Sequence, residues 1–129
     1  LFLIAAWFCR IFGIYVYYKG NKNTYQAVYG FCRLRLDNNP GGKILPDLNN
    51  CAMIREVHVY GNSVSINKKK KEAQHRGFGR KMVKVAENIA RQHNYHKMAI
   101  IAGVGTRQYY QNKCGYHLPS DSTYMMKFI

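Results

Sequence analysis

The sequence predicts a single α/β domain in which helices flank a mixed β-sheet. The length of 129 residues suffices for one compact domain with a buried core. Stretches rich in β-branched and aromatic residues alternate with turns that contain Gly, Pro and Asn. In the second half, a segment with helical periodicity separates two such stretches, and this order is typical of a mixed sheet with helices packed on it.

The first residues are apolar over a length close to a membrane span, but Arg10 interrupts them. We expect a buried helix or strand here, followed by a second strand through Tyr18, because residues 14–18 are β-branched and aromatic. A membrane anchor or signal segment is the alternative, which we do not favour. The chain does not begin with Met and can be a fragment of a longer protein.

Two further strands and a loop are predicted next. Residues 24–36 have the composition of a strand and should form a hairpin with residues 14–18. Residues 37–50 contain the Pro, Gly and Asn of a loop, and residues 51–61 predict another strand. Strict alternation along this strand gives one face with Met53, Arg55, Val57 and Val59, and another with Ile54, Glu56, His58 and Tyr60.

The second half begins with a basic loop, residues 62–73. Residues 80–93 then predict an amphipathic helix, since apolar residues recur every three or four positions. We expect a short strand at 97–105, a shorter helix at 106–115 closed by a C-terminal Gly, and a final strand at 122–129.

The charge indicates an anionic partner. Twenty Lys and Arg against six Asp and Glu give a net charge of +14, so phosphates on a small cofactor or a nucleic acid are the expected ligands. A solvated basic surface without a partner is the alternative.

The cysteines and histidines indicate neither a disulfide framework nor a metal site. Four scattered cysteines without a C-x-x-C pair predict reduced, buried thiols in a cytoplasmic or nuclear protein. The pairs His93/His96 and Cys114/His117 have the chemistry of metal ligands. Nothing in the sequence requires the two pairs to meet, so we assign no metal site.

A glycine-containing turn precedes the predicted helix, in the stretch Gln74-His75-Arg76-Gly77-Phe78-Gly79. A strand, a glycine loop and a helix start together present backbone N–H groups and the positive end of the helix dipole to an anion. The dinucleotide fingerprint would need Gly at Met82, and the Gly-Lys-Ser/Thr of a P-loop is absent. We therefore predict a phosphate site of another kind, with a purely structural turn as the alternative.

Several separated motifs together resemble a known family. The stretch from Gln74 to Gly79 is similar to the pyrophosphate loop of the GNAT superfamily of acetyl-CoA-dependent acetyltransferases. The segments 29–36, 54–61, 73–90 and 103–117 resemble the C-terminal acetyltransferase-like domain of the Elongator catalytic subunits, which modify the wobble uridine of tRNA. This resemblance implies the GNAT fold for residues 15–129, with residues 1–14 as an unmatched apolar segment.

The resemblance implies acetyl-CoA as the cofactor. Backbone groups of Val57, His58 and Val59 would pair with its pantetheine arm as an added strand. The tyrosines Tyr109 and Tyr110 match the functional pair of the family, and a protonated phenol can protonate a leaving thiolate. We expect one of the two to pack against the sheet, and Tyr110 also to contact the cofactor. The pyrophosphate would lie on Gln74, His75, Arg76, Gly77, Phe78, Gly79 and Arg80.

The sequence does not decide which residue is the general base. Glu56 and His58 share a predicted strand face, and either can take a proton from an amine or activate water. A structural role for both residues is the alternative.

The resemblance and the basic charge together imply tRNA as a partner, with other Elongator subunits as further partners. Arg76 and Arg80 can face either RNA or the cofactor phosphates. The candidate RNA-binding residues are Arg33, Arg35, Lys68, Lys69, Lys70, Lys71 and Lys81.

Two alternative functions stay open. An autonomous lysine or histone N-acetyltransferase would need an acidic groove for a basic peptide, and six acidic residues argue against one. An inactive remnant that binds RNA or Elongator subunits is the other. The family couples this domain to a radical S-adenosylmethionine domain, and the cysteine triplet which that domain needs is absent here. If the chain is complete, it can bind and cleave acetyl-CoA but not carry out a radical step. If it is a fragment, the missing half lies upstream, and residues 1 to about 14 mark the break.

Overall fold

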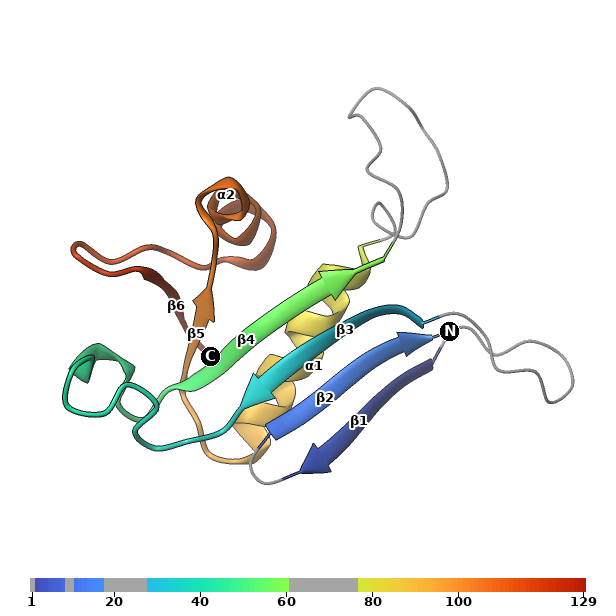
Figure 1. The fold of residues 1–129 in the computed structure, drawn as a ribbon, viewed down its shortest axis with the longest axis horizontal. Helices are drawn as coiled ribbons and strands as arrows, with labels where there is room; N and C mark the ends of the chain where they lie inside the picture. The colour runs from blue at the N-terminus through green and yellow to red at the C-terminus, as the bar shows by residue number, and fades with distance from the viewer. Residues whose placement is uncertain (1, 9–10, 18–27, 61–76) are drawn as a thin grey trace, which may run out of the picture.

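The computed structural model describes residues 2–8, 11–17, 28–60 and 77–129, and its described strands form one six-stranded sheet (Figure 1). Neighbouring strands are antiparallel except β4 and β5, which are parallel. In sheet order, which is also chain order, the strands are β1 (Phe2–Phe8), β2 (Ile11–Tyr17), β3 (Val28–Arg35), β4 (Ala52–Val59), β5 (Lys97–Ile101) and β6 (Tyr124–Phe128). The predicted mixed sheet and the hairpin between β2 and β3 are confirmed, and the first apolar residues form a strand. The boundary expected after residue 14 falls within β2.

One long helix, α1 (Phe78–Gln92), packs against the face of the sheet formed by β2, β3 and β4. It confirms the helix predicted at residues 80–93. The shorter helix predicted at residues 106–115 is a composite of η3 (Val104–Thr106), α2 (Arg107–Tyr109) and the π-helical turn η4 (Tyr110–Cys114). A further 3₁₀ turn, η1 (Pro46–Leu48), lies in the loop before β4. None of the described helices is long and apolar enough to cross a membrane.

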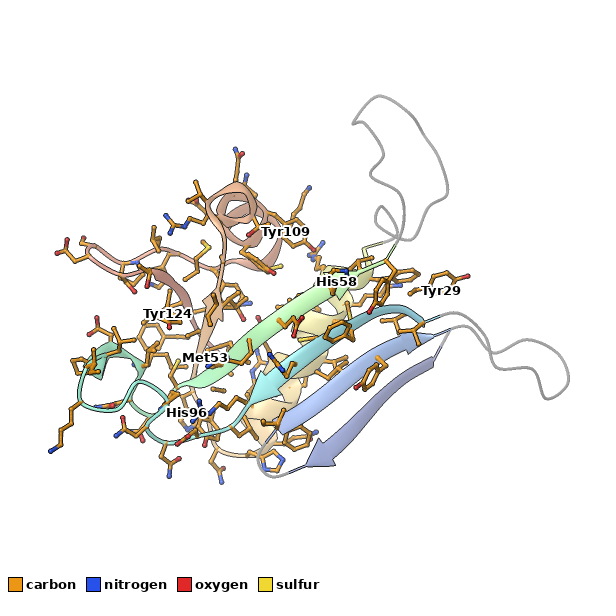
Figure 2. All side chains as sticks on the ribbon, in the orientation of Figure 1. Tyr29, Met53, His58, His96, Tyr109 and Tyr124 are labelled. Carbon is orange, nitrogen blue, oxygen red and sulfur yellow. The ribbon has the colours of Figure 1, made fainter. Side chains whose placement is uncertain are left out.

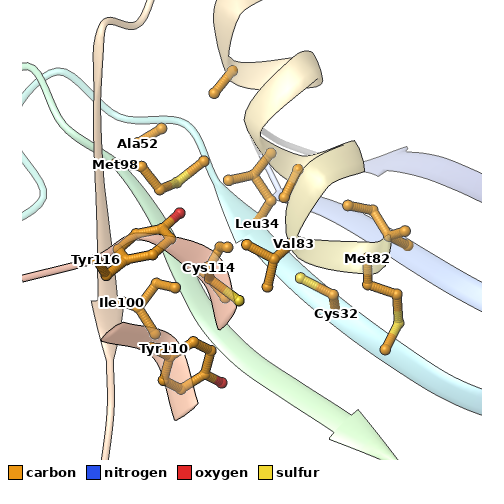
Figure 3. Close-up of a cluster of buried hydrophobic side chains, with 14 of the residues drawn as sticks. Cys32, Leu34, Ala52, Met82, Val83, Met98, Ile100, Tyr110, Cys114 and Tyr116 are labelled. Atoms are coloured by element: carbon orange, nitrogen blue, oxygen red, sulfur yellow. The ribbon is translucent and has the colours of Figure 1, made fainter. Parts of the chain in front are cut away.

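The main core lies between α1 and the sheet (Figure 3). Alternate residues of β2 and β3, such as Ile14, Cys32 and Leu34, point into it and are fully buried. From α1, Met82 and Val83 fill the same space because they recur on one face of the helix. A smaller second cluster forms around Leu48, Cys51, Met53, Ala99 and Met126.

The predicted faces of β4 are wrong before Glu56. The β3–β4 register pairs Arg33 with Glu56 but Leu34 with Ile54, so Arg55 is an extra residue in a β-bulge. The bulge reverses the alternation, and Ile54 therefore joins Val57 and Val59 on the α1 side. Met53 packs instead in the second cluster.

Three of the four cysteines confirm the predicted buried thiols. Cys32, Cys51 and Cys114 are free and buried, whereas Cys9 lies outside the described residues. Burial raises the pKa of Cys32 to about 12 and that of Cys51 to about 11, so both stay protonated at neutral pH.

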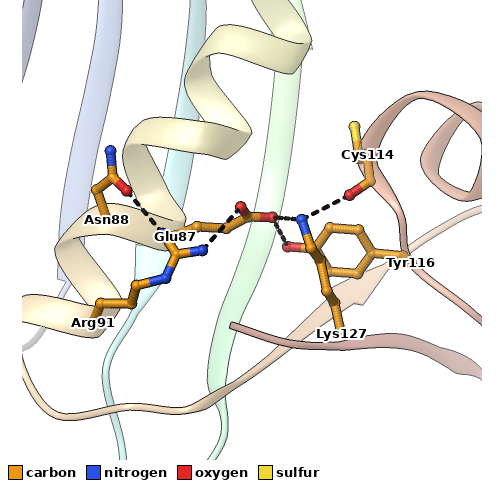
Figure 4. Close-up of polar contacts among 6 residues, drawn as sticks. All are labelled: Glu87, Asn88, Arg91, Cys114, Tyr116 and Lys127. Atoms are coloured by element: carbon orange, nitrogen blue, oxygen red, sulfur yellow. Dashed lines mark hydrogen bonds and ion pairs between the residues drawn. The ribbon is translucent and has the colours of Figure 1, made fainter.

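A buried carboxylate joins α1 to the C-terminal half of the sheet (Figure 4). Glu87 is the one charged residue within the described ranges that is buried, at 4% exposure. It accepts hydrogen bonds from the Tyr116 hydroxyl (3.1 Å) and from Lys127 Nζ (2.9 Å), and Arg91 lies 3.8 Å away. Lys127 Nζ also donates to the Cys114 carbonyl at 2.9 Å. Glu87 thus links α1, β6 and the end of η4.

We predict that Glu87→Ala lowers the free energy of unfolding by about 2 kcal/mol, because Lys127 and Tyr116 lose their shared acceptor in a poorly solvated site. Urea denaturation measures this loss. The matched control is Glu56→Ala, whose carboxylate pairs with Arg33 at 3.3 Å while about half exposed. It should cost less than about 1 kcal/mol. Equal losses in the two variants would contradict the structural role of Glu87.

Candidate cofactor site

The parallel strands β4 and β5 separate at the centre of the sheet. They pair only between Ala52–Ile54 and Met98–Ile100, and β4 then continues to Val59 while β5 runs towards α2 (Figure 1). The His58 carbonyl group of β4 faces β3. Its oxygen lies within 2.7 Å of the position that a Cβ on Gly30 of β3 would occupy. Because successive backbone groups in a strand point to alternate edges, those of Val57 point to the edge that β5 has left.

The start of α1 lies next to this edge, and its N-cap residue Gly77 offers no side-chain cap to the first N–H groups. Gly77 adopts the left-handed conformation with φ of 72°, which only Gly takes readily. The first intrahelical bond runs from the Lys81 amide to the Gly77 carbonyl at 3.1 Å. The first turn contains no acidic residue, so the helix dipole there is not offset by a carboxylate of its own. Gln74, His75 and Arg76 lie outside the described residues.

Residues from three segments meet at the start of α1. A Cβ built on Gly79 would lie 3.0 Å from the Tyr109 hydroxyl and 3.6 Å from a Val59 methyl carbon. Figure 2 shows Tyr109 on the segment after β5 and His58 on the diverging part of β4. The helix start, the open edge of β4 and a phenol are therefore close together.

The two adjacent tyrosines differ in environment. Tyr110 is 7% exposed and packs in the main core, with its ring near those of Tyr109 and Tyr116. Burial raises its pKa to about 12. Tyr109 is 39% exposed. Burial and the nearby Cys114 raise its pKa, while the guanidinium and backbone amide of Arg80 act against that shift. Both phenols are protonated at neutral pH, and Tyr109 is the accessible one.

Glu56 and His58 lie on the sheet face opposite α1. Glu56 is paired with Arg33, and the His58 ring stacks on Phe31 at 5.9 Å between ring centroids. Aromatic rings continue across this face through Tyr15, Phe31, His58 and Tyr60, with neighbouring centroids 4.8 to 6.4 Å apart. The sequence analysis did not identify this row, although the aromatic residues of 14–18 and 24–36 were its signal.

The described candidates for RNA contact are spread over the molecule. Arg33 lies on the aromatic face, and Arg35 is held by Asp37 at 2.6 Å. Lys81 lies on α1, with its ammonium 5.8 Å from the Phe78 ring centroid. The run from Lys68 to Lys71 lies outside the described residues.

A pocket between α1 and the end of η4 was also not predicted. It has a volume of about 250 Å³, and its cationic lining residues come from three elements or turns. They are Arg80, Lys84, Lys113 and Lys127. In sequence they are too far apart to form a recognisable motif. The described part of the chain holds no group of three or more metal-ligating side chains.

Comparisons with known proteins show the family of the chain. A sequence profile of the acetyltransferase (GNAT) family matches residues 4–116. Elongator complex protein 3 of Dictyostelium discoideum is 48% identical over 82 residues, which are 62% of this chain and 14% of that protein. The chain thus spans about a seventh of the length of this relative.

Solved structures show the same fold. The archaeal Elp3 of Methanocaldococcus infernus superposes with a TM-score of 0.72 at 28% identity, over 98% of this chain and 29% of that one. The PaiA N-acetyltransferase of Thermoplasma acidophilum, solved in complex with coenzyme A, has a TM-score of 0.54 at 17% identity, over 92% and 60% of the two chains. Because the family profile covers most of its length, the chain belongs to the GNAT family of acetyltransferases, and its GNAT region is homologous to that of Elongator complex protein 3.

Proposed function

We propose that this domain binds acetyl-CoA and cleaves its thioester in the carboxymethylation of the tRNA wobble uridine. One observation carries the proposal: the start of α1, the diverging edge of β4 and the Tyr109 hydroxyl meet around Gly79. An extended thioester cofactor needs three features: donors that bind its pyrophosphate, a strand edge that pairs with its pantetheine amides, and an acid that protonates its leaving thiolate. Membership of the GNAT family supports an acyltransferase activity for this domain. The similarity to Elongator complex protein 3 supports tRNA as the substrate.

In this proposal, the cofactor lies along the gap between β4 and β5. The N–H groups of Gly77, Phe78 and Gly79 receive the pyrophosphate, since groups at a helix start have no intrahelical acceptors. The Arg80 amide already interacts with the Tyr109 hydroxyl, and the Arg80 guanidinium adds positive charge beside the pyrophosphate. Gln74, His75 and Arg76 are assigned to the same loop from the sequence alone. The outward-pointing backbone of Val57 receives the pantetheine amides as an added strand would. His58 and Val59 flank that contact on β4, and Tyr110 supports the site from the core.

Acetyl-CoA supplies the acetyl group as a thioester. As the carbon–sulfur bond breaks, Tyr109 donates its phenolic proton to the departing thiolate, and the phenol is available because its raised pKa keeps it protonated. Glu56 and His58 are the candidate bases that take a proton from the attacking water or acceptor. Both residues lie on the face of the sheet opposite α1, so the attacking group would approach the thioester from that face.

Two observations support an RNA partner. The net charge of +14 favours binding to phosphates. The exposed face of β2 to β4 carries the aromatic row with Arg33 beside it, and stacked rings next to a cation are a common platform for unpaired bases. Contact with other Elongator subunits, and a place in the cytoplasm and nucleus, are part of the same proposal.

The cofactor site predicts that Gly77→Glu weakens acetyl-CoA binding by at least about tenfold, because a carboxylate would take the place of the anion. Calorimetry on the purified chain measures the affinity. The matched control is Gly42→Glu, since Gly42 also has positive φ (58°) and open space for a Cβ but lies in the loop before β4. It brings the same backbone strain and the same charge. Retained affinity in Gly77→Glu would overturn the assignment.

If Tyr109 is the proton donor, Tyr109→Phe should slow thioester cleavage by about 100-fold, because the leaving thiolate loses its acid. The affinity for acetyl-CoA should change little. Release of the free thiol of CoA, followed with a thiol reagent, measures the rate. Tyr124→Phe is the control, since Tyr124 packs on the second cluster. If Tyr109→Phe turned over at the wild-type rate, its hydroxyl would not be the acid, and the same assay on Tyr110→Phe would test its neighbour.

The aromatic face predicts that Tyr60→Ala weakens binding of a tRNA anticodon stem-loop by about 1–3 kcal/mol, with an unchanged salt dependence. Fluorescence anisotropy at several salt concentrations separates the two effects. Phe128→Ala is the control because Phe128 is 78% exposed and lies on β6, outside this face. Equal binding by both variants would remove the aromatic face from the RNA interface. Acetylation of a lysine peptide without tRNA would instead favour a protein N-acetyltransferase.

A further inference from the structure

The pocket between α1 and the end of η4 is a second polar site, beyond the first turn of α1. Arg80 and Lys84 reach it from α1, Lys113 from η4 and Lys127 from β6. Glu87 lies among them and is the one acidic residue in the lining. Residues from three parts of the fold thus place like charges around one small space.

The positive charge of this pocket is largely uncompensated. Glu87 is already satisfied by Lys127, Tyr116 and Arg91. In the described residues, no carboxylate lies within ion-pair distance of Arg80, Lys84 or Lys113. Three cations held near each other repel one another, and a bound anion would remove that cost.

The dimensions of the pocket limit what that anion can be. At about 250 Å³ it is smaller than the usual site for a whole cofactor, so only part of a larger ligand enters. A phosphate monoester has a charge between −1.5 and −2 at pH 7, and three strong acceptor oxygens. It therefore matches three unpaired cations better than a carboxylate does.

The location of the pocket relates it to the cofactor. Arg80 belongs to the first turn of α1, and Lys84 lies one turn further, about 6 Å along the axis. The proposed function puts the pyrophosphate on that first turn. Coenzyme A carries its third phosphate as a monoester on the 3′ carbon of the ribose that bears the pyrophosphate. The two phosphate groups of one ribose are therefore close enough to use both sites at once.

We propose that Lys84 and Lys113, together with Arg80, bind the 3′-phosphate of acetyl-CoA, so that this domain selects the 3′-phosphorylated cofactor over its dephosphorylated form. The proposal rests on the proposed function, because it uses the same cofactor. It assigns to two lysines of separate elements a role in specificity. Lys127 contributes less, since its ammonium is already bound to Glu87 and to the Cys114 carbonyl.

The test compares the affinities of acetyl-CoA and of 3′-dephospho-acetyl-CoA by calorimetry. Both ligands carry the pyrophosphate, so the ratio of their affinities reports the monoester alone. We expect the wild-type chain to prefer acetyl-CoA by about tenfold or more. The double variant Lys84→Ser with Lys113→Ser should lose that preference while keeping the wild-type affinity for the dephospho ligand. The control is Lys43→Ser with Lys97→Ser, which removes the same charge outside the pocket and should keep the preference.

The outcomes separate this proposal from the proposed function. If both ligands bind equally to the wild-type chain, the pocket does not bind the 3′-phosphate, although the cofactor site stands. A preference that survives in the pocket variant would also overturn the proposal. If neither ligand binds, the proposed function and this inference both fail. Inorganic phosphate, added as a competitor, should weaken acetyl-CoA binding in the wild-type chain more than in the pocket variant. If phosphate weakened acetyl-CoA binding equally in the wild-type chain and in the pocket variant, it would be competing at the pyrophosphate site. That result would contradict a phosphate site in the pocket.

Discussion

The separation of β4 from β5 is the constraint on which the candidate site depends. A strand paired on both edges has no backbone groups to offer, and β4 is paired on both edges only as far as Ile54. The bulge at Arg55 follows directly, and bulges increase local twist and bend the strand. After it, β4 keeps β3 as a neighbour while β5 turns towards α2. The backbone of Val57 and the start of α1 are thereby brought to the same opening.

The Glu87 network fixes the other side of that opening. Glu87 holds Lys127, and Lys127 holds the Cys114 carbonyl, so α1, β6 and η4 keep one spacing. Because Tyr109 directly precedes η4, this spacing also sets how closely its hydroxyl approaches Gly79. Because Glu87 is bound to Lys127, Tyr116 and Arg91, it does not form an ion pair with the other cations of the pocket. A single buried residue therefore contributes both to stability and to the geometry of the phenol.

Local patterns in the sequence predicted the elements, and long-range packing decided what the patterns could not show. The periodicity of α1, the Gly at its start and the adjacent tyrosines are all local signals. The bulge at Arg55 is set by pairing with β3, so simple alternation put Met53 and Ile54 on the wrong faces. The pocket was missed because Lys84 and Lys113 meet only after folding. Similarly, the sequence allowed for one tyrosine to be buried but could not tell which.

Gly79 connects the proposed anion site to the proposed acid. Its lack of a side chain allows the Tyr109 hydroxyl to lie against the first turn of α1, where a Cβ would come within 3.0 Å of that oxygen. The backbone amide of Arg80 and its guanidinium stabilise the ionised form of the phenol, against the effect of burial. As a result, the groups proposed to hold the pyrophosphate also act on the proposed acid. Cofactor phosphates bound there would add negative charge beside the phenol, which would raise its pKa further and keep its proton until the thiolate forms.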